Sequence, residues 1–110
     1  MNTIDSAVNS KSQEFIENSE VMQGLVDDLQ AQVARVMEGG GERYQQRHQA
    51  RGKLLVRDRI DALIDAGSPF LEFSQLAGLD MYGQDEVPAA GLVTGIGRVA
   101  GQECVIVAND

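Results

Sequence analysis

The chain has 110 residues and a formal net charge of −8, with 43% hydrophobic and 24% charged residues, so its composition is that of one small globular domain and not of a disordered segment. A sequence pI near 4.5 argues against general binding to nucleic acid or to an anionic membrane surface. No apolar run reaches the roughly 18 residues that a membrane span requires.

The first residues, MNTIDSAVNSKSQEF, lack the features of a targeting peptide. They contain neither a basic stretch followed by an apolar one nor the Arg-rich, acid-poor composition of a transit peptide. We therefore expect neither secretion nor import. The single cysteine, Cys104, has no internal disulfide partner and lies in the apolar run CVIVA, where it is expected to be a small buried hydrophobe. Both features predict a cytoplasmic location.

A long amphipathic helix is predicted from about Ser10 to the glycines at 39–41. Ser10 and Gln13 have the spacing of a capping box, and the three glycines provide a stop. The apolar residues recur at steps of three and four: Met22, Leu25, Val26, Leu29, Val33, Val36 and Met37. This apolar stripe requires a surface to bury it, which is either the rest of its own domain or another subunit.

A basic segment follows the glycines. It holds six of the nine Lys and Arg residues: Arg43, Arg47, Arg51, Lys53, Arg57 and Arg59. The segment is predicted to form a helix from Glu42 to about Ala50, with a turn at Gly52. Arg43, Arg47 and Arg51 would then line one helix face, where like charges repel. Such a face requires anions opposite it, either carboxylates of the same protein or phosphates of a ligand.

A further helix is predicted before Gly67 and Pro69, with Val56, Ile60, Leu63 and Ile64 as its apolar face. Asp61 lies four residues from Arg57, and Asp58 is close to other cations, so Arg57 and Arg59 are expected to form structural ion pairs. Three of the other four cations, Arg47, Arg51 and Lys53, have no acidic neighbour within a helical turn. They are the better candidates for binding an anionic ligand.

The spacing of the apolar residues changes after Pro69. Phe70, Leu71, Phe73 and Leu76 predict a short strand, and residues 81–88 predict an acidic surface loop. GLVTGIGRV and CVIVA are predicted to pair as a hairpin around Ala100 and Gly101. The glycines of the first strand indicate close backbone approach or bulges, and the continuous apolar run of the second is typical of a strand covered on both faces. Residues 1–110 alone provide little apolar surface for the second face, so an exposed edge strand that pairs with other chains is expected in them.

No residue pattern predicts a catalytic side chain or a metal site. Gly95, Gly97 and Ala100 match the dinucleotide-binding spacing G-x-G-x-x-A, but a strand follows them where that motif requires a helix. His48, the only histidine, is expected to be a solvated or cap-forming helix residue, and no set of zinc ligands accompanies it. Cys104 has no basic neighbour in sequence that would activate it as a nucleophile.

Four blocks between residues 39 and 110 carry a family resemblance: GGGERYQQRH, ARGKLLVRDRI, DAGSPFLE and GLVTGIGRVAGQECVIVAND. In this order they resemble the opening of the carboxyltransferase (beta) subunits of biotin-dependent acyl-CoA carboxylases. Within that family they are most similar to the methylcrotonoyl-CoA carboxylases, with the geranyl-CoA carboxylases as near relatives.

The resemblance implies an α/β fold in which amino-terminal helices precede the first strands of a truncated crotonase-like (ClpP/crotonase) domain. Residues 1–41 would form a helical arm, and residues 42–110 would begin the carboxyltransferase N-terminal domain. It implies transfer of a carboxyl group from carboxybiotin to an acyl-CoA. In this family backbone N–H groups stabilise the enolate, and they are expected after Asp110, so residues 1–110 alone are expected to be inactive. A non-catalytic helical interaction module is the alternative that the amphipathic arm leaves open.

The resemblance also implies the partners of the chain. Biotin would be carried on a biotin carboxylase and biotin carrier (alpha) subunit, a CoA ester would be the substrate, the beta subunits would form a homo-oligomer, and no metal would be bound in this subunit. Because the amino-terminal half handles the CoA ester in this family, Arg47, Arg51 and Lys53 are expected to bind the CoA phosphates.

Overall fold

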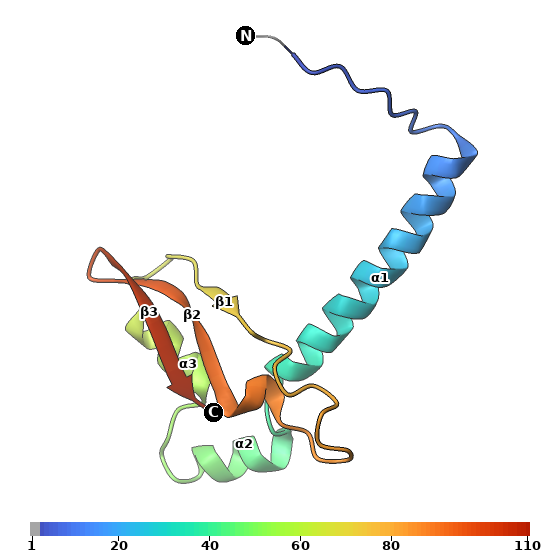
Figure 1. Ribbon diagram of the computed structural model, residues 1–110. Coiled ribbons are helices and arrows are strands. Elements are labelled where there is room, and N and C mark those ends of the chain that lie inside the picture. Colours follow the sequence, from blue (N-terminus) through green and yellow to red (C-terminus); the bar gives the residue numbers. More distant parts are fainter. Residues whose placement is uncertain (1–2) are drawn as a thin grey trace. The chain divides into compact units, whose positions relative to one another are not determined.

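The computed structural model describes residues 3–110, and the chain divides into two compact units, Met1–Ala31 and Gln32–Asp110. In chain order the elements are α1 (Gln13–Met37), α2 (Glu42–Gln49), α3 (Val56–Leu63), β1 (Leu71–Phe73), the 3₁₀ turn η1 (Pro88–Gly91), β2 (Leu92–Val99) and β3 (Gln102–Asn109) (Figure 1). Helices followed by a small sheet are the expected α/β order. The division into an arm of residues 1–41 and a domain from residue 42 stays a prediction.

The start of α1 differs from the predicted capping box. Ser12, not Ser10, takes the N-cap position, since its Oγ accepts a hydrogen bond from the N–H of Phe15 at 3.2 Å. The Gln13 amide donates to Glu17 Oε1 at 2.8 Å and therefore does not reach back to the cap. At the other end the N–H of Gly39, whose φ is +69°, donates to the carbonyl of Val36. The predicted glycine stop is thus confirmed.

The apolar stripe of α1 is largely exposed. Only Val36, in the last turn, is buried, whereas Met22, Leu25 and Leu29 are each at least half exposed. Whether the stripe packs on its own domain or on another subunit stays a prediction.

The two short helices follow the predicted bounds closely. Residues with positive φ, Gly41 at +85° and Gly52 at +71°, frame α2. Val56 and Ile60 of α3 are buried, as predicted. Leu63 is exposed, so its assignment to the apolar face is wrong. The helix ends at Leu63, and the extended Ile64 packs against the core in its place.

The sheet has the strand order β1-β2-β3, and both pairings are antiparallel. Val99 pairs with Gln102, so a two-residue turn of Ala100 and Gly101 connects β2 to β3, with φ values of +50° and +78°. Two successive positive φ values are typical of the type I′ turns that match strand twist. The predicted hairpin is confirmed, and because a strand follows Gly101, the dinucleotide-binding motif is excluded here.

The core lies on one face of this sheet, under α3 (Figure 1). Its buried members are Val56, Ile60, Val93 and Ile106. On the opposite face the register places six apolar side chains that are all exposed: Leu71, Phe73, Leu92, Ile96, Val105 and Val107.

Within residues 3–110 α3 covers only one side of the sheet, so the second apolar face of β3 is exposed, as expected for these residues alone. Val105 is 70% exposed, whereas Ile106 is 8% exposed. Cys104 is half-buried and donates a weak hydrogen bond to the carbonyl of Gln102, at 3.5 Å, so it is less buried than expected.

Candidate functional site

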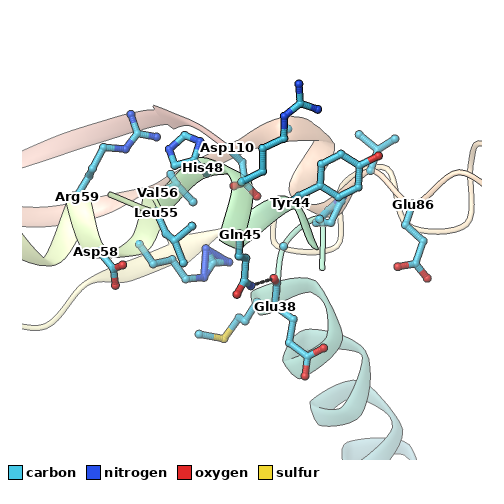
Figure 2. Close-up of a pocket in the computed structure, with 18 of the residues that line it drawn as sticks. Glu38, Tyr44, Gln45, His48, Leu55, Val56, Asp58, Arg59, Glu86 and Asp110 are labelled. Carbon is cyan, nitrogen blue, oxygen red and sulfur yellow. Dashed lines mark hydrogen bonds between the residues drawn. The ribbon is translucent and has the colours of Figure 1, made fainter. Parts of the chain in front are cut away.

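A cavity of about 710 Å³ lies within the unit Gln32–Asp110, which is in the range of about 300–1,000 Å³ typical of ligand sites. Its walls come from the end of α1, from α2, from the start of α3, from the segment 86–91 and from Asp110 at the end of the chain. Figure 2 shows ten of the lining residues by name.

The exposed side of α2 supplies one wall. Tyr44 and Arg47 line the cavity from one face of α2, three residues apart, and Arg51 lines it from the turn that follows the helix. The sequence forms a helix here because seven consecutive residues after Glu42 lack Gly, Pro and β-branched side chains. The Gln45 side-chain amide, also on the wall, donates to the carbonyl of Glu38 (Figure 2).

His48 has a structural contact. Its Nε2 lies 3.0 Å from the carbonyl oxygen of Leu54, six residues further on. This contact ties the turn after α2 back onto the helix. Because Leu54 lies beyond the end of α2, this contact does not cap the helix, and the expected cap-forming role is not observed.

Two of the three predicted phosphate-binding residues line the cavity. Arg47 and Arg51 both do so and are both exposed. Lys53 is exposed but lies outside the lining. Among residues 3–110 the ion pairs within 4.0 Å involve only Arg35 and Arg57 as cations, so these three side chains have no carboxylate partner in the described part of the chain.

Arg57 and Arg59 have partners other than those predicted. Nη2 of Arg57 lies 2.8 Å from Oε1 of Glu72 on β1, and the Arg57 side chain is 23% exposed. The predicted pairing with Asp61 is wrong, because Arg57 faces the sheet and Asp61 is exposed to solvent. Arg59 donates to the backbone carbonyl of Asn109 instead of forming an ion pair. Both guanidinium groups are thus used to hold the fold together, as expected, and Arg47 and Arg51 remain for a ligand.

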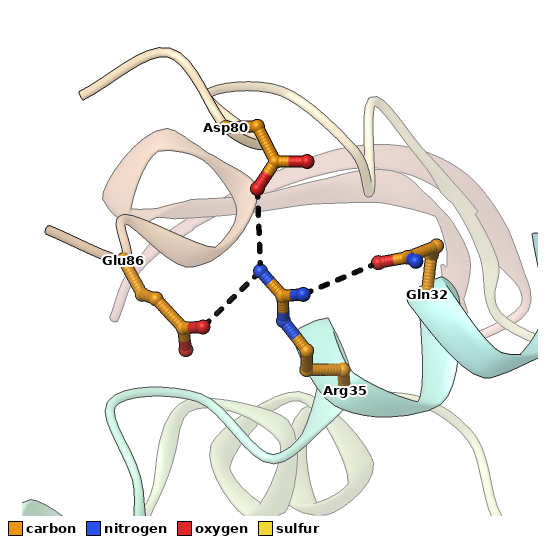
Figure 3. Close-up of polar contacts among 4 residues, drawn as sticks. All are labelled: Gln32, Arg35, Asp80 and Glu86. Carbon is orange, nitrogen blue, oxygen red and sulfur yellow. Dashed lines mark hydrogen bonds and ion pairs between the residues drawn. The ribbon is translucent and has the colours of Figure 1, made fainter. Parts of the chain in front are cut away.

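Four acidic residues also line the cavity, and one of them, Asp110, is drawn next to His48 in Figure 2. Figure 2 shows Glu38 and Asp58 on the opposite side of the view from Tyr44 and His48. The fourth, Glu86, is paired with Arg35 at 3.1 Å, and Arg35 also contacts Asp80 and Gln32, each at 3.5 Å (Figure 3). Arg57 and Arg59 have protein partners, so Arg47 and Arg51 are the cavity-lining arginines without a side-chain partner among the described residues.

A strained turn forms part of the rim. Pro88 and Gly91 line the cavity, and between them Ala89 and Ala90 have φ values of +49° and +53°. Left-handed backbone costs a non-glycine residue about 1–2 kcal/mol, and such strain is found most often at functional sites. The N–H of Asp110 donates to the carbonyl of Gly91 at 3.0 Å, which joins the end of the hairpin to this turn.

The sequence prediction missed Tyr44, the turn 88–91 and Asp110 as parts of this site. Tyr44 could have been found, since its spacing to Arg47 and Arg51 is readable in the sequence. The turn 88–91 and Asp110 reach the cavity only because strands pair in the folded chain. Within residues 3–110 no group of three or more His, Cys, Asp or Glu side chains is arranged to hold a metal ion, and no helix there is long and apolar enough to cross a membrane.

Comparison with known proteins places the chain in a family. The Carboxyl transferase domain family matches residues 47–110. The chain is 52% identical to the mitochondrial methylcrotonoyl-CoA carboxylase beta chain of Dictyostelium discoideum over 99% of the chain and 18% of that protein.

Two solved structures are similar. The beta subunit of P. aeruginosa geranyl-CoA carboxylase has a TM-score of 0.83 at 30% identity, over 98% of the chain and 20% of that subunit. The transcarboxylase 12S hexamer has a TM-score of 0.69 at 32% identity, over 81% of the chain and 18% of its own. The chain thus spans about a fifth of the length of these relatives. Because the family match covers more than half of the chain and the fold recurs in a solved beta subunit, the chain belongs to the carboxyl transferase family of acyl-CoA carboxylase beta subunits.

Proposed function

We propose that the chain is part of a carboxyltransferase subunit that moves a carboxyl group from carboxybiotin to an acyl-CoA, namely 3-methylcrotonoyl-CoA in leucine catabolism. The observation that carries the proposal is the pair Arg47 and Arg51, two arginines without a carboxylate partner among residues 3–110 at a cavity of about 710 Å³. The name of the Dictyostelium relative supports the choice of acyl group. The geranyl-CoA carboxylase neighbour supports geranyl-CoA as the alternative.

In this proposal Arg47 and Arg51 bind the phosphates of the CoA ester, and Lys53 contacts them from outside the cavity lining. A CoA ester carries a diphosphate and a ribose phosphate, and guanidinium groups bind phosphate oxygens through charge-assisted, often bidentate hydrogen bonds. Two arginines that line the same cavity can reach neighbouring phosphates.

The chemistry itself is assigned to parts of the subunit beyond these residues. When bound, biotin on a partner subunit supplies the carboxyl group, and backbone N–H groups stabilise the enolate of the acyl-CoA. No residue of this chain is assigned to biotin, and the chain's own contribution is to bind and orient the CoA portion of the substrate.

The same proposal includes partners. A biotin carboxylase and biotin carrier subunit would deliver carboxybiotin, and beta subunits would assemble with one another, as the hexamer named for transcarboxylase 12S supports. We place the enzyme in the cytoplasm, and we propose no metal in this subunit.

The test is a carboxylation assay of the full-length subunit with its biotin-bearing partner against 3-methylcrotonoyl-CoA, geranyl-CoA and propionyl-CoA. We expect the first to have the highest kcat/KM. A higher kcat/KM with geranyl-CoA would change the proposed substrate and leave the proposed reaction unchanged. Omitting the biotin-bearing partner is the control and should abolish turnover.

One other candidate function has an observation of its own. The exposed apolar stripe of α1 would suit a non-catalytic helical interaction module. Failure of the assembled enzyme to carboxylate any acyl-CoA would favour it.

A further inference from the structure

Tyr44 is an aromatic side chain held at the cavity with most of its surface open. It is 67% exposed, and it lines the cavity beside the two arginines without a carboxylate partner in the described chain. In the described part of the chain its hydroxyl has no hydrogen-bond partner within 3.5 Å. The chemistry it offers to a ligand is therefore mainly that of its ring.

The base of the Tyr44 ring borders Gly40, which has no side chain to cover it. A Cβ placed on Gly40 would lie 3.5 Å from Cβ and 3.6 Å from Cγ and Cδ2 of Tyr44, so the glycine leaves this side of the ring uncovered. An aromatic ring with most of its surface open is suited to stack on a planar ligand group.

The neighbours of Tyr44 indicate which planar group this is. Arg47 follows at i+3 on α2, and Arg51 lies in the turn after the end of α2, and both line the same cavity as the ring. An aromatic platform flanked by arginines recognises a base that carries phosphates, because every base has a face to stack and the arginines neutralise the phosphate charge. The apolar side chains of Leu55, Val87 and Pro88 line other parts of the cavity and suit the uncharged part of such a group.

We propose that Tyr44 is the platform on which the adenine ring of the CoA ester stacks, with Arg47 and Arg51 on the adjacent phosphates. This inference rests on the proposed function, since it assigns one part of the same substrate to one side chain. Tyr44 thereby becomes a positioning residue for the nucleotide end of the substrate, distant from the reacting acyl group.

The test compares three variants of the full-length subunit in its assembled enzyme. Tyr44→Ala removes the ring, Tyr44→Phe keeps it, and Tyr82→Ala is the matched control, because Tyr82 is exposed but does not line the cavity. Each is assayed with the acyl-CoA and with the acyl ester of 4′-phosphopantetheine, which lacks the adenosine.

We expect Tyr44→Ala to raise the KM for the acyl-CoA about tenfold, within the range for loss of one stacked base, and to leave the KM for the truncated ester unchanged. Tyr44→Phe and Tyr82→Ala should match the wild-type enzyme with both substrates. An unchanged KM of Tyr44→Ala for the acyl-CoA, or an equal rise with both esters, would overturn the inference.

A binding measurement separates this inference from the proposed reaction. Adenosine 3′,5′-bisphosphate is titrated into the wild-type subunit and into Tyr44→Ala by calorimetry. A Kd that is about tenfold weaker for Tyr44→Ala supports the stacking role even if the acyl substrate has been misassigned. Equal Kd values for the two proteins overturn the stacking role even if the enzyme carboxylates an acyl-CoA.

Discussion

The carboxylate of Asp65 accepts a hydrogen bond from the backbone N–H of Ala100 at 2.7 Å, across 35 residues of sequence. Its second oxygen accepts from the N–H of Gly101 at 2.9 Å, and its own N–H donates to the carbonyl of Arg98 at 2.8 Å. Asp65, which follows α3, thus binds both N–H groups of the β2–β3 turn. The hairpin is thereby attached to the helix layer at the end far from the cavity.

Asp65→Ala is expected to loosen this turn, by about 1.5 kcal/mol, because two hydrogen bonds to a charged group are lost. Amide hydrogen exchange at Ala100 and Gly101 should accelerate, with smaller changes elsewhere in the sheet. Asp61→Ala, on the exposed side of α3, is the control. Unchanged exchange at both turn amides in Asp65→Ala would show that the carboxylate does not stabilise the turn.

Gly95→Ala is expected to destabilise the sheet by about 1–3 kcal/mol. A Cβ at Gly95 would lie 2.4 Å from Cζ of Phe70 and 2.5 Å from the carbonyl oxygen of Leu71, and the second atom is backbone that cannot move aside cheaply. In contrast, Gly24→Ala in α1 meets no atom within 4 Å and should stabilise the helix by about 0.5–1 kcal/mol. Thermal unfolding that ranks the two variants in the opposite order would contradict this account.

Arg51→Glu in the full-length subunit is expected to raise the KM for the CoA ester more than tenfold, because it replaces a phosphate-binding cation by an anion. The wild-type KM should itself rise with ionic strength, since the contact is exposed and screened by salt. Arg43→Glu carries the same charge change on the same segment but does not line the cavity, and it is the control. An unchanged KM in a stable Arg51→Glu protein would remove Arg51 from the site.

Leu29→Asp is expected to impair assembly of the subunits before it impairs folding. Leu29 is half exposed on the apolar stripe of α1, and a carboxylate there would be buried without a partner in an interface. Sedimentation of Leu29→Asp should show dissociated subunits, whereas Gln30→Asp, on the polar side of the helix, should sediment as the wild type. A wild-type oligomer for Leu29→Asp would leave only packing within the same domain.

Residues 1–110 produced alone are expected to be inactive and poorly packed. Val105 and Val107 are 70% and 63% exposed on an edge strand, and the adjacent side chains on that face are apolar too. Such an edge pairs readily with other chains. Light scattering should show self-association, which the double change Val105→Lys and Val107→Lys should reduce. Slow, cooperative hydrogen exchange across residues 91–108 in a monomer would show that these residues close their own core.

Features that depend on neighbouring residues were predictable from the sequence. The bounds of α2 followed from a run without helix breakers, and the hairpin followed from two apolar runs around Ala100 and Gly101, because each depends on a few consecutive residues. The N-cap of α1 was placed two residues early. Several short polar residues precede that helix, and only the backbone path selects Ser12 among them.

The sequence by itself also determined the family and the location of the cationic segment, since both can be read from consecutive residues. The tertiary structure decided which of those cations have partners. Arg57 pairs with Glu72, 15 residues away, and Asn109 accepts from Arg59 across 50 residues. It also decided which face of β3 is exposed and that Tyr44 and Asp110 border one cavity. Each of these depends on how helix and sheet pack together, and residue spacing along the chain carries no information about a contact made between separate elements.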